Sequence, residues 1–255
     1  MTIKALLRKQ QTCLFEDESI LVLNKPAGIT VNRSETTRHE ETVQDWLEKR
    51  LKTEKLKLRN RLSESDFYKR AGIVHRLDKE TSGILLVAKD EDSFMNLQKQ
   101  FKERMVKKTY LALTHGKIKV KEGEIKVPVG RLPWNRKRFG ILAGGRESVT
   151  EYKVLNYFIS KKNNSEFYSL VELYPKTGRT HQIRVHLKFI NHPIFSDFLY
   201  AGRKTAREDR KILKRVFLHA SKISFSHPKS GERMAFESPL PPDLSKTLQQ
   251  DFSKI

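Results

Sequence analysis

One aspartate, Asp78, stands out among the side chains that could do chemistry. It lies in the segment HRLDKETSG, residues 75–83, two positions after Arg76. If HRLD is extended, Arg76 and Asp78 point to one side of the chain and Leu77 to the other. Turn-forming residues follow, and then the apolar run at 84–89, which predicts a buried strand. Asp78 is therefore expected at the entrance of a buried strand, where a carboxylate can be held rigidly and still be reached.

Two interpretations of this carboxylate remain open from the residues alone. An aspartate before a turn commonly accepts hydrogen bonds from backbone N–H groups and so caps the turn. Carboxylates also act as enzyme nucleophiles that form covalent intermediates with sugars. A nucleophilic carboxylate must be ionised. Because burial alone raises the pKa of a carboxyl group, an enclosed site of this kind needs a fixed cation close by.

Other chemistries lack their motifs in this chain. The eight histidines do not show the His-Glu-x-x-His spacing of a zinc enzyme, and the single cysteine, Cys13, cannot build a zinc cluster or an internal disulfide. The KTG triplet at 176–178 is shared with serine β-lactamases, but the Ser-x-x-Lys element expected upstream of it is missing. We therefore expect no metal site.

The elements that would position Asp78 follow from hydrophobic spacing and capping signals. A capping box formed by Thr42 and Asp45 opens one predicted helix, Asp90 caps a second, and Thr180 is a possible cap for a third at 180–190. The second helix carries an apolar face that runs from Phe94 to Met105. Apolar or alternating runs predict strands, which fall at 20–23, 84–89, 107–116, 125–129, 150–158, 167–175 and 215–228. Several strands follow one another directly, which favours an α+β fold with a mixed, mainly antiparallel central sheet and flanking helices.

The charge of the chain indicates a polyanionic partner. Lys and Arg total 51 against 30 Asp and Glu, a formal net charge of +21. Phosphate neutralisation by such residues drives most non-specific nucleic-acid binding. An anionic membrane surface is the rival, but the chain has no lipidation motif, no apolar run of spanning length and no signal-peptide core, so we expect no membrane partner and a cytoplasmic location. The basic segments 49–61, 131–138 and 203–215 are candidates to follow a nucleic-acid backbone, and the second of them carries an exposed Trp134.

The motifs around and after Asp78 resemble those of the RluA family of RNA pseudouridine synthases. HRLDKETSG, followed by ILLVAK, is the first similarity. The others are KKTYLAL (107–113), PVGRLPWNRKRF (128–139) with ESVTEYKVL (147–155), KTGRTHQIRVHL (176–187), HPIFSDFLY (192–200) and FLHASKISFSHP (217–228). The similarity runs in collinear order over roughly residues 14–240, and each motif is long.

The resemblance implies a reaction. Members of the family detach a uracil base from its ribose in RNA, turn it and rejoin it through carbon 5, which needs no external cofactor. Asp78 matches the family nucleophile, and Arg184 matches the arginine that pairs with it. Arginine suits this task because it stays charged and binds a carboxylate with two parallel hydrogen bonds. The attacked atom of the uridine is left open, as is removal of a sugar proton as the first step.

The resemblance also implies roles around the target base. Tyr110 matches the tyrosine that stacks on the uracil and is suspected of handling the proton at carbon 5, and Leu218 resembles an apolar wall of the uracil pocket. Because the base must be flipped out to be reached, Arg76 is a candidate to fill its place or to hold a phosphate. Arg179 and Lys108 are further candidates for RNA contacts. The basic neighbours of Asp78 are assigned to RNA, not to ion pairing with it.

The expected organisation is a short N-terminal extension at 1–13 and a catalytic domain at 14–245. No separate N-terminal RNA-binding domain is expected. The sheet should divide into two halves around an active-site cleft, in a monomer that acts on ribosomal or transfer RNA. The main rival is a non-catalytic RNA-binding or ribosome-assembly protein, which would have no need to keep Asp78, Tyr110 and Arg184 together. A DNA-binding regulator ranks lower, since no helix-turn-helix, zinc-finger or heptad pattern is evident.

Overall fold

The computed structural model describes residues 12–34, 37, 40–55, 65–136 and 138–255. The chain divides into two compact units. The first comprises Met1–Val106 and Lys222–Ser238, and the second Lys107–Ser221 and Pro239–Ile255. Most of the basic stretch predicted at 49–61 falls outside the described residues and side chains.

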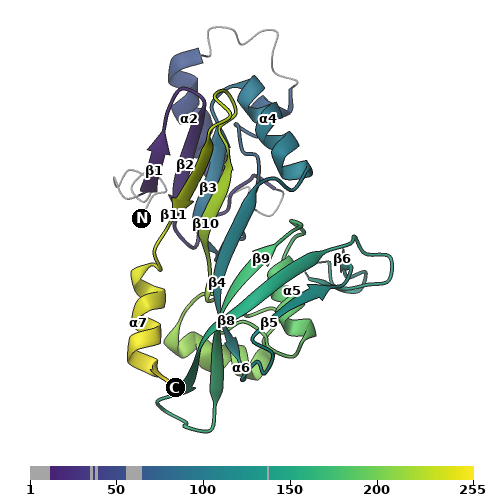
Figure 1. Ribbon diagram of the computed structural model, residues 1–255, viewed down its shortest axis with the longest axis vertical. Helices are drawn as coiled ribbons and strands as arrows, with labels where there is room; N and C mark the ends of the chain where they lie inside the picture. The colour runs from purple at the N-terminus through teal and green to yellow at the C-terminus, as the bar shows by residue number, and fades with distance from the viewer. Residues whose placement is uncertain (1–11, 35–36, 38–39, 56–64, 137) are drawn as a thin grey trace. The chain divides into compact units, whose positions relative to one another are not determined.

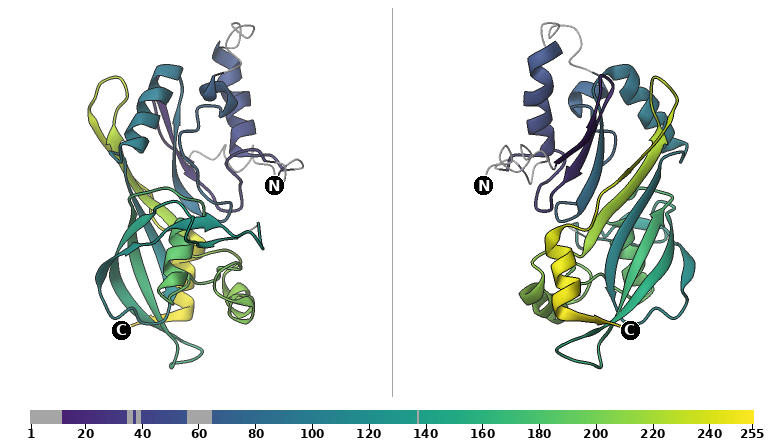
Figure 2. Two further views of the ribbon diagram at one scale, coloured as in Figure 1. Left: turned by 90° about the vertical axis from the view of Figure 1, so that its right-hand side faces the viewer. Right: turned by 60° about the vertical axis from the view of Figure 1, so that its left-hand side comes forward.

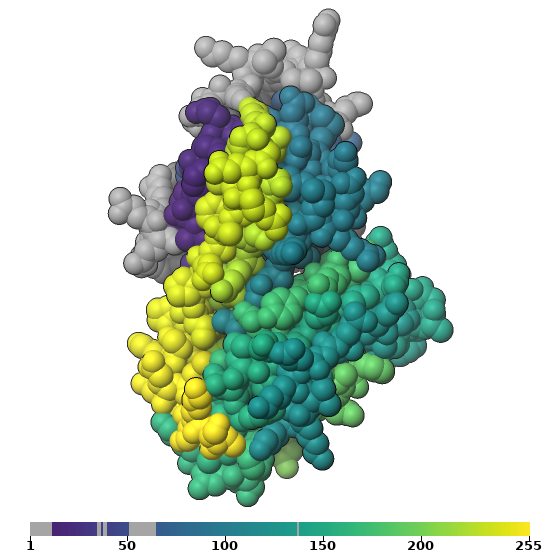
Figure 3. All heavy atoms as spheres, viewed as in Figure 1, coloured from purple at the N-terminus to yellow at the C-terminus, as the bar shows by residue number. Residues whose placement is uncertain are grey.

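The first unit is a small sheet with helices (Figure 1). Its strands are β1 Cys13–Glu16, β2 Ile20–Lys25, β3 Ser82–Ala88 and β11 Arg233–Glu237, and its helices are α2 Val43–Lys55, α3 Asp66–Lys69 and α4 Glu91–Lys102. Strand β10, Leu218–Ser226, begins in the second unit and ends in the first, where it pairs with β11. The order β1–β2–β3 is antiparallel throughout. The β10–β11 hairpin lies between β1 and α4 on the face shown in Figure 3.

The core of the first unit forms because β2 and β3 alternate their side chains across the sheet. Their register pairs Val22 with Leu86 and Asn24 with Ile84, so these residues share one face. Phe94 and Leu97 of α4 belong to the same buried cluster as Val22, Ile84 and Leu86. All seven residues of β3 are buried, as the continuous apolar run predicted.

The second unit is built on a larger antiparallel sheet, with the order β4–β9–β8–β12 and with β5 paired to β8. Its strands are β4 Lys107–His115, β5 Glu122–Lys126, β6 Val129–Arg131, β7 Phe139–Ile141, β8 Val149–Ser160, β9 Phe167–Pro175 and β12 Phe252–Lys254. Its helices are α5 Gln182–Phe189, α6 Arg203–Ile212 and α7 Pro242–Asp251. Strands β6 and β7 form a separate hairpin. Helix α7 leads directly into β12 at the C-terminus (Figure 2).

The α+β class and the mainly antiparallel sheet are confirmed, and so are two of the predicted caps. Thr42 and Asp45 exchange hydrogen bonds at the start of α2, with Thr42 Oγ1 donating to Asp45 Oδ2 at 2.6 Å. Asp90 Oδ1 accepts from Ser93 N at 2.9 Å at the start of α4. Local sequence fixes both features because each cap lies within three residues of its partner.

Three details of the predicted elements are wrong. Helix α4 ends at Lys102, so Met105 lies beyond it and is exposed. Helix α5 begins after His181, which has a left-handed backbone conformation, and Thr180 is not its cap. The alternating residues at 125–129 belong to two strands, since β5 ends at Lys126 and β6 begins at Val129.

Helix α5 carries a buried histidine, His186, which is 0% exposed. Burial lowers the pKa of His186 to about 4. Ser148 Oγ donates to the carbonyl of Val127 at 2.6 Å, so the 2.9 Å contact between Ser148 Oγ and His186 Nε2 is a hydrogen bond donated by a neutral imidazole. Within the described part of the chain, His186 Nδ1 has no hydrogen-bond partner.

We expect acid to destabilise the protein through His186. The unfolded histidine, with a pKa near 6.5, takes up a proton at a higher pH than the folded one. The contribution of neutral His186 to the free energy of unfolding is therefore fully present above about pH 6.5 and is lost as the pH drops toward 4. The expected loss between pH 7.5 and pH 5 is about 2 kcal/mol. Urea unfolding of the wild type and of His186→Gln at both pH values measures the difference, and an equal loss in the two proteins would contradict this origin.

Candidate active site

Asp78 lies in a loop of the first unit that leads into β3. Its carbonyl accepts from Thr81 N at 3.1 Å, which closes the predicted turn. Leu77 is buried, Arg76 is exposed and Asp78 is half-buried, so the three side chains alternate in burial as expected. The strand itself begins only at Ser82, so Asp78 stands one tight turn ahead of it. The carboxylate is thus carried by a turn next to a buried strand.

The segment before Asp78 is fixed along β3 by its backbone. Gly72 and Ala88 are joined by a 2.9 Å backbone hydrogen bond, and Ile73 forms a bridge with Val87. Gly72 has φ +74°, and a Cβ at this position would lie 2.0 Å from the carbonyl oxygen of Ala88. Only glycine fits so close an approach with that backbone conformation. The chain therefore reaches Asp78 from a well-defined point on the strand.

His75 adds a side-chain anchor to the same segment. The backbone N–H of Leu86 donates to His75 Nε2 at 2.9 Å, so this nitrogen is an acceptor and carries no proton. The imidazole also stacks on Phe101 of α4, with ring centroids 4.9 Å apart. His75 therefore locks the approach to Asp78 against both β3 and α4.

A buried lysine, Lys25, fastens the turn from the other side. Its side chain is 1% exposed. The ammonium group donates to three backbone carbonyls, those of Pro26 at 2.9 Å, Ile29 at 2.9 Å and Lys79 at 3.3 Å. Gly28 N also donates to the carbonyl of Lys79, at 2.7 Å. The loop after β2 and the turn after Asp78 are thus joined through one cation, and sequence reasoning missed this residue.

Replacing Lys25 by methionine should destabilise the first unit and impair the site. The change removes the side-chain donor of the Pro26 and Ile29 carbonyls from a buried site, which we expect to cost about 3 kcal/mol of the free energy of unfolding. Chemical unfolding measures this cost. Lys99→Met, the same substitution at an exposed position of α4, is the matched control and should change stability by less than about 0.5 kcal/mol. Equal stability of the two variants would show that Lys25 does not fasten the turn.

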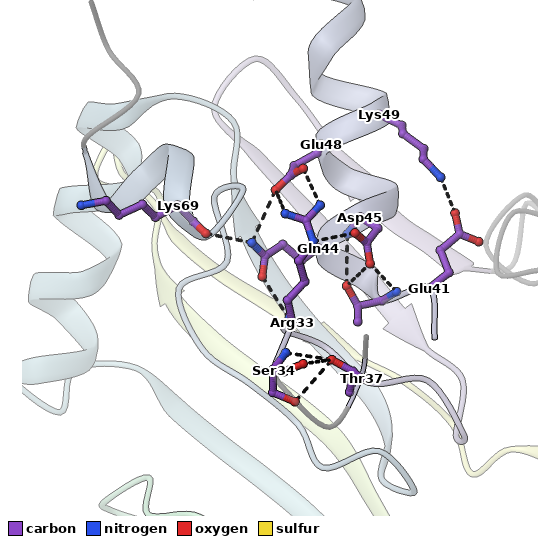
Figure 4. A network of polar contacts seen from close by, with 10 residues as sticks. Arg33, Ser34, Thr37, Glu41, Gln44, Asp45, Glu48, Lys49 and Lys69 are labelled. Carbon is purple, nitrogen blue, oxygen red and sulfur yellow. Dashed lines mark hydrogen bonds and ion pairs between the residues drawn. The ribbon is translucent and has the colours of Figure 1, made fainter. Parts of the chain in front are cut away.

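The loop after β2 is held in turn by charges on α2 (Figure 4). Arg33 Nε donates to Asp45 at 2.6 Å, and its two terminal nitrogens donate to the two oxygens of Glu48 at 2.8 and 2.6 Å. Burial alone would raise the pKa of Asp45, but the hydrogen bonds from Thr42 and Arg33 outweigh it and lower that pKa. These contacts fix the loop that presents Gly28 to the turn.

Lys79, the residue after Asp78, pairs with a glutamate. Its Nζ lies 2.7 Å from Glu40, and both side chains are about half exposed. An exposed pair of this kind contributes little stability, because solvent screens it. Lys79 therefore has a carboxylate partner, while its predicted contact with RNA remains a prediction.

In the second unit, Tyr110 lies on the sheet face that is covered by α5. The register of β4, β9 and β8 places Tyr110, Leu173 and Tyr152 in one row, and Thr150 is on the same face as Tyr152. Thr150 Oγ1 accepts from Gln182 Nε2 of α5 at 2.9 Å. The helix that carries Arg184 thus packs on the face that carries Tyr110.

Arg184 is buried and forms a bidentate ion pair. Its Nε donates to Asp197 Oδ2 at 2.7 Å and a terminal nitrogen donates to Asp197 Oδ1 at 2.9 Å. Oδ1 also accepts from the backbone N–H groups of Leu199 and Tyr200. The guanidinium carbon lies 5.0 Å from the ring centroid of Tyr200. Sequence reasoning missed Asp197, although an aspartate inside the mostly apolar run 194–200 was a signal, because buried carboxylates are almost always paired.

Tyr200 connects this pair to the start of α5. Its hydroxyl is 2.9 Å from His181 Nδ1 and accepts from Phe139 N at 3.0 Å. His181 has φ +56°, a left-handed conformation that costs energy for a residue with a Cβ. The aromatic contacts of His181 with Phe139 and Tyr200 compensate this strain and hold the first turn of α5 in place.

The remaining predicted residues of the second unit are distributed around this face. Arg179 precedes α5, and its Nε donates to the carbonyl of Glu147 at 3.2 Å. Leu218 is 3% exposed and belongs to the buried cluster against which Tyr110 packs. Lys108 lies on β4, and burial lowers its pKa to about 8, so it is mainly charged at neutral pH and loses that charge as the pH rises above 8.

The residues predicted for the site are divided between the two units. Asp78 and Arg76 belong to the first unit, whereas the other five candidates belong to the second, namely Lys108, Tyr110, Arg179, Arg184 and Leu218. The pairing of Asp78 with Arg184 remains a prediction. Among the described residues, no group of three potential metal ligands from His, Cys, Asp and Glu is found. No helix in the described part of the chain has the length and apolar character needed to cross a membrane.

Comparison with solved structures finds the same fold. A human protein named RNA Pseudouridylate Synthase Domain Containing 1 matches 96% of this chain and 88% of its own, with a TM-score of 0.70 and 27% identity. The human RNA Pseudouridylate Synthase Domain Containing 4 has a similar fold, with a TM-score of 0.68 and 24% identity, and matches 96% of this chain and 94% of its own.

Sequence comparison identifies the family. The model of the RNA pseudouridylate synthase family matches residues 19–189. Ribosomal large subunit pseudouridine synthase D of Nitrosomonas europaea is 38% identical over 92% of this chain and 64% of its own length. For the two Neisseria meningitidis proteins with the same name, the match covers 59% of their own length. The chain thus spans about three fifths of these relatives. An uncharacterized RNA pseudouridine synthase of Bacillus subtilis is 35% identical over 92% of this chain and 71% of its own. The chain belongs to the RluA-type family of RNA pseudouridine synthases.

Proposed function

We propose that this protein is an RNA pseudouridine synthase that isomerises specific uridines. The main observation behind this proposal is that the family model matches residues 19–189, a segment that includes Asp78, Tyr110 and Arg184. In the reaction, the bond between C1′ of the ribose and N1 of uracil breaks, and a bond between C1′ and C5 forms. The proton on C5 leaves and N1 takes up a proton, so no oxidant, reductant or added group is needed.

Asp78 is proposed as the nucleophile. The turn that presents it is fixed by Lys25, and the segment before it is fixed by Gly72 and His75. A carboxylate held in this way loses little conformational freedom when it attacks, which is how preorganised groups accelerate reactions. Arg184 is proposed as the cation that keeps the carboxylate ionised during the reaction. Its own orientation is supported by the bidentate contact with Asp197.

Tyr110 and Leu218 are proposed to bind the uracil base. A tyrosine ring offers a stacking surface for a flipped base, and its phenol can transfer a proton near carbon 5. The location of Tyr110 on the face covered by α5 supports this assignment. Arg76, Arg179 and Lys108 are proposed to contact the RNA. Trp134, 75% exposed in the loop between β6 and β7, is proposed to stack on a nucleotide in the same way.

The proposed substrate is ribosomal RNA, with transfer RNA as the second candidate. The first three relatives are named for the large ribosomal subunit, which favours ribosomal RNA. The enzyme is proposed to act as a monomer in the cytoplasm. The net charge of +21 supports binding of a long polyanion.

The direct test uses RNA labelled with tritium at carbon 5 of uridine. Incubation of the purified protein with large-subunit ribosomal RNA transcript and with total transfer RNA should release tritium from one of them, because the C5 proton is lost only when the new bond forms. Mapping of pseudouridine in the product identifies the nucleotide. Tight RNA binding without release of tritium from either RNA would leave the chain as a non-catalytic RNA-binding protein.

A further inference from the structure

Helix α6 carries a stripe of exposed cations. We define the basic stripe as Arg203, Lys204, Arg207, Lys211 and Lys214, all of them exposed. At about 100° per residue, the four helical members lie within roughly 100° of one another around the axis. Ala206 and Asp209 of the same helix are buried on the opposite side. The helix therefore presents one positively charged edge to solvent along its whole length.

Few carboxylates neutralise this stripe. Glu208 lies 2.6 Å from Lys211 and 3.9 Å from Arg207. The other acidic residue of the helix, Asp209, is buried and contacts His115 at 2.9 Å. Within the described parts of the chain, Arg203, Lys204 and Lys214 have no carboxylate within ion-pair distance. The stripe therefore keeps most of its charge available for a partner.

An exposed aromatic ring stands beside the stripe. Phe198 is 62% exposed, and the guanidinium carbon of Arg210 lies 5.8 Å from its ring centroid. Arg210 is itself held by two backbone carbonyls, that of Ser196 at 3.1 Å and that of Lys214 at 2.7 Å. A fixed guanidinium against an exposed ring forms a rigid surface on which a nucleotide base can stack.

Another surface of the same unit has a different arrangement of charge. On β5, β8 and the end of β9, Lys126, Lys153 and Lys176 each lie within 4.0 Å of a glutamate. These lysines are about half exposed or more, like the stripe, yet each is paired. The cations of α6 thus differ from these three lysines in being mostly unneutralised, so the basic composition alone does not produce the stripe.

We propose that the basic stripe and Phe198 form a second RNA-binding surface, which holds a structured part of the substrate RNA. The proposal rests on the proposed function for its substrate. The helical part of the stripe, from Arg203 to Lys211, extends about 12 Å at 1.5 Å per residue, enough to contact several successive phosphates. An anionic membrane fits less well, because a helix that binds the bilayer surface needs an exposed apolar face. Here Ala206 is buried, Ile212 packs against the buried cluster of the unit, and Phe198 is a single ring.

The test compares two triple variants with equal change of charge. The stripe variant is Arg203→Gln, Lys204→Gln and Lys214→Gln, the three members without a carboxylate at ion-pair distance among the described residues, and the control variant is Lys126→Gln, Lys153→Gln and Lys176→Gln. Dissociation constants are measured for a large-subunit ribosomal RNA transcript over a range of salt concentrations. The stripe variant should bind at least about tenfold more weakly, and its salt slope should fall by about 2 to 3, since each lost phosphate contact removes about 0.9. The control variant should stay within about threefold of the wild type.

Other measurements separate the alternatives. Phe198→Ala should weaken binding by about tenfold through lost stacking. Equal weakening by both triple variants would overturn the proposal in favour of a general charge effect. Loss of binding to phosphatidylserine vesicles with unchanged RNA affinity would overturn it in favour of a membrane surface. Tritium release by the wild type is followed in parallel. Stripe-dependent RNA binding without any release would refute the proposed function but leave the second surface standing.

Discussion

Asp78→Asn should abolish pseudouridine formation while leaving RNA affinity within about threefold of the wild type. An amide has nearly the same shape as a carboxylate but is not a nucleophile, so the chemical step should slow by about a thousandfold or more. The turn itself should survive, because it is closed by the backbone carbonyl of Asp78 and by Lys25, neither of which changes. Single-turnover tritium release gives the rate, and filter binding with the same RNA gives the affinity.

The control for this prediction is Asp92→Asn, the same substitution at an exposed position of α4 in the first unit. It should release tritium at the rate of the wild type. Near-normal tritium release by Asp78→Asn would contradict the assignment of Asp78 as the nucleophile and would favour a turn-capping role for it. A large loss of RNA affinity in that variant would instead indicate that the carboxylate organises the binding surface.

The parts of the structure that sequence predicted best are those with local causes. The strand at β3 follows from an unbroken apolar run, and the starts of α2 and α4 follow from caps that act over three residues. The exposure of Trp134 was also predicted, because a polar, basic loop has nothing to bury it. The motifs placed the family correctly for the same reason, since each is a continuous string that needs no knowledge of the fold.

The parts that sequence missed depend on contacts between distant segments. Lys25 donates to the carbonyl of a residue 54 positions away, and no local pattern distinguishes a buried lysine from an exposed one. Asp197 forms an ion pair with Arg184, which is 13 positions away in the sequence. Only the burial of both side chains shows that this pair contributes to the structure. The left-handed His181 was missed because its strain is compensated by Tyr200 and Phe139, which lie elsewhere in the chain.

The buried pair Arg184–Asp197 gives the second large prediction. Arg184→Met should lower the single-turnover rate by about a hundredfold or more, and more than it lowers RNA affinity, because Asp78, the proposed nucleophile, would lose its proposed counter-charge. It should also destabilise the second unit, since Asp197 would be left buried with no cation. Asp197→Asn should also destabilise the second unit, because the buried guanidinium of Arg184 would be left without its carboxylate. Removing one partner of a buried ion pair costs about 3 to 5 kcal/mol of the free energy of unfolding.

The double variant Arg184→Met/Asp197→Asn separates the structural role from the chemical one. Removing both charges leaves no uncompensated ion in the core, so its loss of unfolding free energy should be smaller than the sum of the two single losses. Its rate should stay as low as that of Arg184→Met, because the restored packing does not supply a cation to Asp78. Stability regained without activity would assign Arg184 to the chemistry. If activity returned together with stability, Arg184 would only hold α5 in place, and the cation for Asp78 would have to be sought on another residue.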